Sequence, residues 1–147
     1  MNKVELPAHL AQLYLEDETA WLEAMAGLAA ERRFADMDIE HLGEFLADMA
    51  RRDKREVLSR LTALLLHLLK WEHQPEQRSN SWRATIMNQR EELKDLLESG
   101  TLRNYAGEVL AKAYERAVKQ VVAETGLSES TFSEECPFSL DAALESE

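Results

Sequence analysis

Apolar residues recur at three- and four-residue steps along most of this chain, which is the period of amphipathic helices. The first segment with this period runs from about Leu10 to Arg32, the second from Ile39 to Met49 and the third from Val57 to Trp71. In the third segment, apolar side chains cover more than half of the helix circumference. We therefore predict that it is a central helix packed on several sides.

Capping and turn residues mark the remaining helix ends. Gln74-Pro75 ends the third segment, because a residue before proline is disfavoured in the α region. Residues 79–81, Ser-Asn-Ser, are N-cap candidates for a fourth helix that closes at Ser99-Gly100. A fifth helix is predicted from about Leu102 to Thr125, with Gly126 as its stop.

The tail beyond Gly126 carries scattered apolar residues, and we predict a strap that lies on the bundle, with a short helix after Ser139. The predicted fold is all-α, a single-domain bundle of about five helices with an extended C-terminal strap. The domain covers residues 1–147, with its core over about 10–126 and the strap over 127–147. No strand is expected, because 5 Gly and 3 Pro provide few turn residues for a sheet.

Length and composition indicate a soluble globular protein, since 147 residues with 45% hydrophobic content can bury a sizeable core. The most apolar run, Leu61 to Leu69, is about half the ~20 residues that a membrane span needs. The N-terminus lacks the apolar core of a secretory signal. Cys136 is the single cysteine, which excludes an intrachain disulfide and favours a cytoplasmic location without a membrane partner.

The net charge of −11 disfavours a generally basic nucleic-acid binder, but the charge is unevenly distributed. Residues 1–50 contain 3 Lys or Arg and 11 Asp or Glu, whereas residues 51–90 contain 9 and 4, and no Lys or Arg follows residue 119. One interpretation is that the acidic ends pair with the basic middle in weak surface ion pairs. The other is that arginines of the middle stay unpaired and bind an anion.

The stretch from Lys70 to Arg90 is the densest in aromatic and polar residues, with a tryptophan on each side of a proline-containing turn. One interpretation is structural, with Gln89, His67 and Arg83 bonding loop carbonyls and fixing the turn. The other is a pocket that binds a small anion. The candidate pocket or anion-binding residues are His67, Trp71, Gln74, Arg78, Trp82, Arg83, Gln89 and Arg90.

The same region carries a family resemblance. The stretch LLLHLLKWEHQPEQRSNSWRATIMNQR (64–90), together with ERRFADMDIEHLGEFLADM (31–49) and EECPFSL (134–140), resembles the bacterial family catalogued as domain-of-unknown-function family 29. The resemblance extends from about Tyr14 to Leu144. It implies an all-helical, cytoplasmic bacterial protein of uncharacterised activity, and it supplies no catalytic residue.

Other candidate chemistry is weak. No Glu-x-x-His motif exists, and Asp38-x-x-His41 followed by Glu44 is better explained by helix capping, so no metal and no cofactor is predicted. The carboxylates next to Cys136 should raise its pKa, which favours a packed anchor over a nucleophile.

The sequence contains no recognisable catalytic motif, so the question of an enzyme stays open. Our leading hypothesis is a binding or interaction module that acts on a partner protein or by self-association, because acidic ends beside a basic middle favour charge-complementary association. The alternative is a binding protein or enzyme for a small anion, such as a nucleotide or phosphorylated metabolite. Nucleic-acid binding through residues 51–60 is the weakest hypothesis, given the net charge.

Overall fold

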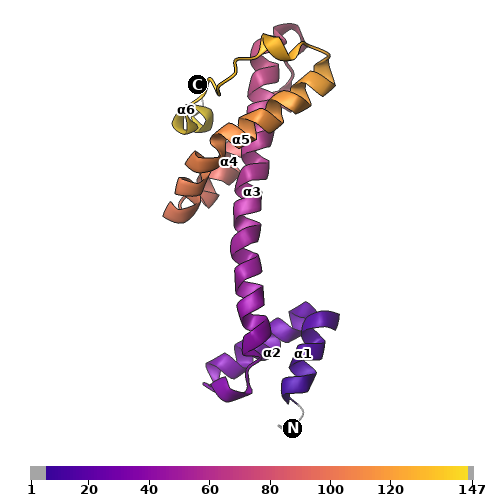
Figure 1. Cartoon of the computed structure of the whole chain (residues 1–147), viewed down its shortest axis with the longest axis vertical. Coiled ribbons are helices and arrows are strands. Elements are labelled where there is room, and N and C mark those ends of the chain that lie inside the picture. The colour runs from indigo at the N-terminus through magenta and orange to yellow at the C-terminus, as the bar shows by residue number, and fades with distance from the viewer. Residues whose placement is uncertain (1–5, 146–147) are drawn as a thin grey trace. The chain divides into compact units, whose positions relative to one another are not determined.

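A computed structural model describes residues 6–145, with side chains from residue 9 onward. Every regular element in this range is helical and none is a strand, which confirms the predicted all-α fold (Figure 1). The α-helices are α1 (Leu6–Glu16), α2 (Glu18–Ala30), α3 (Ile39–His73), α4 (Asn80–Leu96), α5 (Gly100–Thr125) and α6 (Leu140–Leu144). Short 3-10 turns occupy η2 (Phe34–Asp36), η3 (Pro75–Gln77) and η4 (Glu129–Thr131).

The first predicted helix is in fact two helices, divided at Asp17. Its side chain accepts a hydrogen bond from the backbone N–H of Ala20 at 3.1 Å, and it caps α2. Aspartate is among the best N-cap residues, so the chain restarts a helix here although the apolar period continues. The prediction of one helix from about Leu10 to Arg32 was wrong for that reason.

The second and third predicted helices are one helix, α3, of 35 residues. We predicted a break because the apolar stripe is interrupted between residues 50 and 56, where no residue is buried. That segment, ARRDKRE, contains no Gly or Pro and consists mostly of strong helix formers. The backbone therefore continues through a stretch that packs little apolar surface.

Among the later boundaries, the predicted stop of the fourth helix at Ser99-Gly100 was wrong. Helix α4 ends at Leu96, and the Ser99 hydroxyl accepts the backbone N–H of Leu102 at 3.3 Å and caps α5, which begins at Gly100.

The other predicted signals agree with the structure. The Ser79 hydroxyl accepts the backbone N–H of Trp82 at 3.2 Å and caps α4. Gly126 ends α5 in the left-handed region at φ 76°, as expected for a C-terminal glycine. The short helix predicted after Ser139 is α6.

The chain forms two compact units, residues 1–50 and residues 51–147, each with a buried apolar cluster of its own. Unit 1 contains α1, α2 and the first turns of α3. Unit 2 contains the rest of α3 together with α4, α5 and the tail. The single domain over residues 1–147 stays a prediction.

Unit 1 is organised around Trp21, which is completely buried. Its ring contacts Tyr14 and Phe45 at centroid distances of 4.8 and 5.7 Å. Its indole N–H donates to Asp38 Oδ2 at 3.2 Å, and the same oxygen lies 2.7 Å from His41 Nδ1. Because a carboxylate only accepts, the hydrogen of this second bond is on Nδ1 of His41.

Asp38 joins this core to the start of α3. Its Oδ1 accepts the backbone N–H of His41 at 3.3 Å, which is the predicted capping role. Burial by itself raises the pKa of Asp38, but the bonds from the His41 ring and backbone and from the Trp21 indole outweigh it and hold the pKa below 3.8. The ionised carboxylate is therefore the form that stabilises unit 1.

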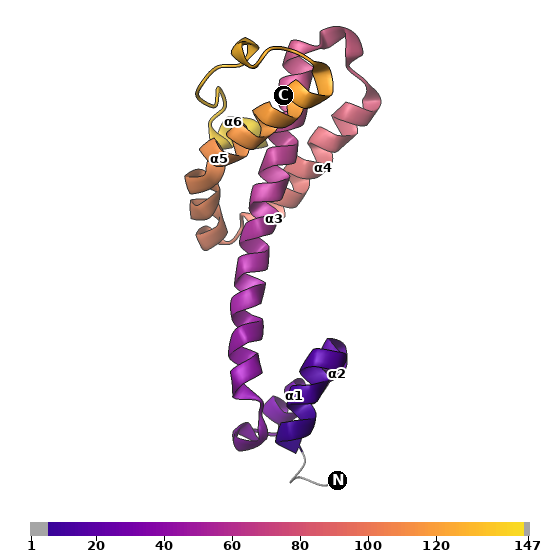
Figure 2. The ribbon, with the colours of Figure 1, turned by 45° about the vertical axis from the view of Figure 1, so that its right-hand side comes forward.

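Unit 2 is built on the leucine-rich second half of α3. Figure 2 shows α4 and α5 running along this part of α3. Helix α5 faces it with small residues, and Ala106, Ala113 and Ala117 are completely buried. The tail joins the same cluster through buried side chains that include Phe132 and Leu144, as expected for a strap.

We predict that Asp38→Ala lowers the stability of unit 1 by about 1 kcal/mol, the usual value of an N-cap. Hydrogen exchange of the amides in residues 18–50 measures this change. In the unmutated protein the Asp38 contribution should be present above pH 3.8 and disappear as the pH falls through the lower folded-state pKa. Glu40→Ala, two residues further along the chain and exposed, is the control. Equal effects of the two substitutions would contradict the role of Asp38.

Alanine substitutions at two glycines, one inside α5 and one at its C-terminal cap, should change the stability in opposite directions. Gly107 lies inside the helix with nothing within 4 Å of an added Cβ, so Gly107→Ala should stabilise by about 0.5–1 kcal/mol. Gly126 has φ +76°, so Gly126→Ala should destabilise by about 1–2 kcal/mol. Urea unfolding followed by circular dichroism distinguishes these signs.

Candidate binding pocket

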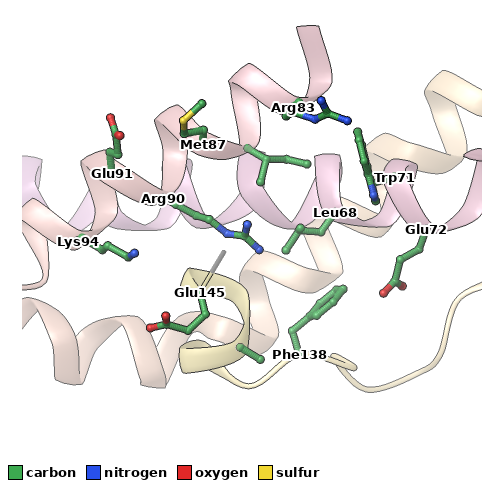
Figure 3. A pocket seen from close by; sticks show the side chains of 12 residues that line it. Leu68, Trp71, Glu72, Arg83, Met87, Arg90, Glu91, Lys94, Phe138 and Glu145 are labelled. Carbon is green, nitrogen blue, oxygen red and sulfur yellow. The ribbon is translucent and has the colours of Figure 1, made fainter. Parts of the chain in front are cut away.

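Unit 2 contains a half-open pocket of about 640 Å³ between α3, α4 and the tail (Figure 3). Helix α3 provides Leu68, Trp71 and Glu72; helix α4 provides Arg83, Ile86, Met87, Arg90, Glu91 and Lys94; and the tail provides Phe138, Ala142 and Glu145.

The α4 wall follows from helical spacing. Arg83, Met87, Arg90 and Lys94 are separated by four, three and four residues, and this spacing places them on one face. Ile86, only 8% exposed, connects this wall to the core, while Met87 is 53% exposed at the rim. The wall thus combines an apolar base with cationic side chains of different exposure.

Two guanidinium groups lie near the ring of Trp71. The Arg78 guanidinium lies 4.8 Å from its ring centroid, and the Arg83 guanidinium lies 5.6 Å from it. Arg78 Nε also donates to the backbone carbonyl of Trp71 at 2.8 Å. Cation–π contacts at exposed sites contribute about 0.5–1 kcal/mol each, enough to bias the positions of these side chains.

The arginines of the pocket differ in their partners. Within residues 9–145, neither Arg78 nor Arg83 has a carboxylate at ion-pair distance, and both are exposed. Arg90 instead donates from Nε to the carbonyl of Ala143 at 2.9 Å, and Figure 3 shows it directed toward α6. Arg90 therefore attaches the tail to α4, whereas Arg83 lies beside Trp71 at one end of the pocket.

The structure brings some of the predicted site residues together and separates others. Trp71, Arg83 and Arg90 line the pocket, and Arg78 contacts Trp71. The remaining predicted residues are outside the lining. These are His67, Gln74, Trp82 and Gln89.

Three of these four have partners of their own within unit 2. His67 Nδ1 is 2.9 Å from the carbonyl of Ala63, one turn earlier in α3. The Gln89 carbonyl oxygen accepts from Arg60 at 3.3 Å. The Lys70 ammonium lies 4.7 Å from the centroid of the Trp82 ring, and Trp82 does not line the pocket.

Sequence inspection missed nine lining residues. Those on α4 share a helical row with Arg83, so the period could have identified Met87 and Lys94. The tail residues had no such signal, because only the packing of Phe132 and Leu144 onto the core places Phe138 and α6 at the pocket.

The lining charges limit what the pocket can hold. Three cations are balanced by Glu72, Glu91 and Glu145, so a ligand with several phosphates would meet as many carboxylates as cations. Among the described lining residues there is no Ser, Thr, Cys or His, so none supplies a hydroxyl or thiol nucleophile or a histidine base. The arrangement suits binding of an apolar body with one anionic group.

Other basic residues of the middle segment have carboxylate neighbours. Arg60 Nε is 2.8 Å from Glu56 and its Nη2 is 3.7 Å from Glu92. Lys70 lies 3.7 Å from Glu124. Part of the positive charge of residues 51–90 is therefore paired within unit 2. Arg83 has no carboxylate partner among the described residues.

Neither Cys136 nor the acidic residues of segment 38–44 add a reactive centre to the part of the chain that is described. Cys136 donates to the carbonyl of Phe138 at 3.3 Å, and burial raises the pKa of its thiol. The predicted direction of this shift agrees, although its cause is burial rather than neighbouring carboxylates. In residues 6–145 there is no group of three or more His, Cys, Asp or Glu arranged for a metal ion, and no helix long and apolar enough to cross a membrane.

Comparison with known proteins identifies one family. Residues 13–147 match the model of the family described as domain of unknown function DUF29. No curated protein and no solved structure matches the chain.

Because Arg90 attaches the tail to α4, Arg90→Ala should increase the rate at which Cys136 reacts with a thiol reagent such as dithionitrobenzoate. The loss of a hydrogen bond of about 1 kcal/mol corresponds to an increase of about fivefold in the open population of the tail. Lys112→Ala, at an exposed position of α5, is the control. Identical rates in the two variants would show that Arg90 does not hold the tail.

Proposed function

The chain belongs to the family described as domain of unknown function DUF29, and we propose that this member is a binding protein. Its site is the pocket between α3, α4 and the tail. Its ligand has an aromatic or aliphatic body and a single anionic group.

The observation that carries this proposal is the position of Arg83. Its guanidinium is exposed, lies 5.6 Å from the Trp71 ring and has no carboxylate partner within residues 9–145. A guanidinium binds carboxylate, sulfonate or phosphate oxygens with two parallel hydrogen bonds. An anion held there would leave the rest of its ligand against Leu68, Ile86 and Phe138, which line the same pocket.

A nucleotide or another polyphosphate is the less favoured ligand class, since three carboxylates line the pocket. An enzymatic role is also less favoured, because the described lining residues include no Ser, Thr, Cys or His. We place the protein in the bacterial cytoplasm as part of this proposal. The single cysteine supports a reducing compartment.

Two fluorescent probes that differ by one anionic group test the proposal. Anilinonaphthalene sulfonate should bind with saturable enhancement, and N-phenylnaphthylamine, which lacks the sulfonate, should bind more weakly. Arg83→Gln should weaken the binding of the sulfonate probe about tenfold, because it removes a charged hydrogen bond of about 1.5 kcal/mol. It should leave the binding of the neutral probe nearly unchanged.

Met87→Glu places a carboxylate at the pocket rim. It should also weaken the binding of the sulfonate probe more than that of the neutral probe. Lys112→Gln removes a cation from α5 outside the pocket and should change neither probe. Equal loss with Lys112→Gln would show a non-specific charge effect and refute the site. Stronger displacement of the probe by nucleotides than by dodecanoate would instead support the polyphosphate alternative.

A further inference from the structure

A second, smaller groove of unit 2 lies between α3 and α5, which run side by side (Figure 2). Its volume is about 270 Å³, less than half that of the pocket beside α4. The lining residues are Ser59, Thr62, Ala63 and Leu66 of α3, and Arg116 and Gln120 of α5. None of them lines the larger pocket, so the groove is a separate feature.

Helical spacing places these residues in two rows, one on each side of the groove. The four α3 residues occupy positions i, i+3, i+4 and i+7 and therefore share one face, and the two α5 residues are four apart. Thr62 and Leu66 are each only 7% exposed, whereas Ser59, Arg116 and Gln120 are exposed. Most of the polar side chains are thus at the rim, where a ligand can reach them.

Three of the polar lining residues have hydrogen-bond donors that the protein does not use. Within residues 9–145, the side chains of Ser59, Arg116 and Gln120 make no hydrogen bond or ion pair with another residue. Thr62 differs, because its hydroxyl donates to the carbonyl of Leu58 at 2.8 Å. The groove therefore presents a guanidinium, a hydroxyl and a carboxamide whose N–H and O–H groups are free to donate.

The charge of this groove is also different from that of the larger pocket. Arg116 is the only charged side chain among the described lining residues, and no carboxylate accompanies it. The acidic residues nearest along the chain have basic partners: Glu115 lies 3.9 Å from Lys119, and Glu56 lies 2.8 Å from Arg60. An anion that entered the groove would meet a guanidinium with no carboxylate in the lining to compete for it.

We propose that this groove binds a phosphate group, either as free phosphate or as the monoester of a small alcohol. A phosphate monoester presents three strong acceptor oxygens. Arg116 can donate two parallel hydrogen bonds to two of them, and Ser59 and Gln120 can each donate one more. A carboxylate has only two oxygens and satisfies fewer of these donors. The small volume of the groove suits a phosphate with little attached to it.

Nuclear magnetic resonance of the full chain, titrated with anions at constant ionic strength, tests the proposal. Sodium phosphate should shift the signals of Ser59, Arg116 and Gln120 saturably, with a millimolar dissociation constant. Sodium acetate should bind about threefold more weakly, as expected for one hydrogen bond fewer. Glycerol phosphate distinguishes the two sources, because it should bind as tightly as phosphate if a monoester is the ligand and more weakly if free phosphate is.

Variants of the rim residues should change the affinity for phosphate by different amounts. Arg116→Gln should weaken binding about tenfold, because it removes charge-assisted hydrogen bonds, and Ser59→Ala should weaken it about threefold. Ser59→Asp places a carboxylate in the groove and should abolish binding. Lys112→Gln is the control, because it removes the same charge one turn earlier on α5, outside the lining, and should change the dissociation constant less than about twofold.

The outcomes separate this groove from the larger pocket. Arg83→Gln should leave phosphate binding here unchanged, and Arg116→Gln should leave binding of the sulfonate probe unchanged, so either site can fail without the other. Circular dichroism checks that all variants keep their helix content. No saturable shift with phosphate, equally tight binding of acetate, or an equal loss in Lys112→Gln would overturn the proposal.

Discussion

Burial of the leucine-rich face of α3 is the interaction on which unit 2 depends. Val57, Leu61, Leu64 and Leu65 have no exposed surface, and each such side chain contributes about 1.5–3 kcal/mol through burial. Helices α4 and α5 and the tail all attach to this face. The pocket lies at its edge, because Leu68 and Trp71, which line it, are only partly buried. The site therefore depends on the core and on the tail that packs against it.

The charges of the chain divide into groups with different roles. Arg60 and Lys70 face carboxylates of neighbouring helices, and pairs of this kind contribute little to stability. Arg90 holds a backbone carbonyl of the tail. Arg83 has neither kind of partner within the described residues, which is why an anion is the natural complement to it. The net charge by itself gives none of these distinctions.

Unit 1 depends on a hydrogen-bond network around Asp38 as well as on its apolar core. Its small core has few large apolar side chains, and Asp38 ties Trp21, His41 and the start of α3 together through three hydrogen bonds. A partly buried carboxylate is costly unless its bonds are made, so this network favours one particular arrangement of α2 against α3. On another side of α3, Ile39 and Leu46 stay exposed.

The sequence by itself determined the helical class, the start of α4, the end of α5 and the short α6, because hydrophobic period, caps and Gly126 are local signals. It failed where local signals compete: Asp17 capped a new helix despite a continuing apolar period, and the polar segment 50–56 stayed helical without apolar burial. For the site, it identified Trp71, Arg83 and Arg90, which lie within one segment.

Only the tertiary structure decided which of the neighbouring polar residues face that pocket and which are satisfied elsewhere. His67 and Gln89 share the same dense segment, yet they bond to Ala63 and Arg60 outside the lining. Phe138 and α6 complete the pocket from about 50 residues further along the chain, because the tail packs onto the core. Helical spacing fixes the face of a residue on its own helix, but packing decides what that face meets.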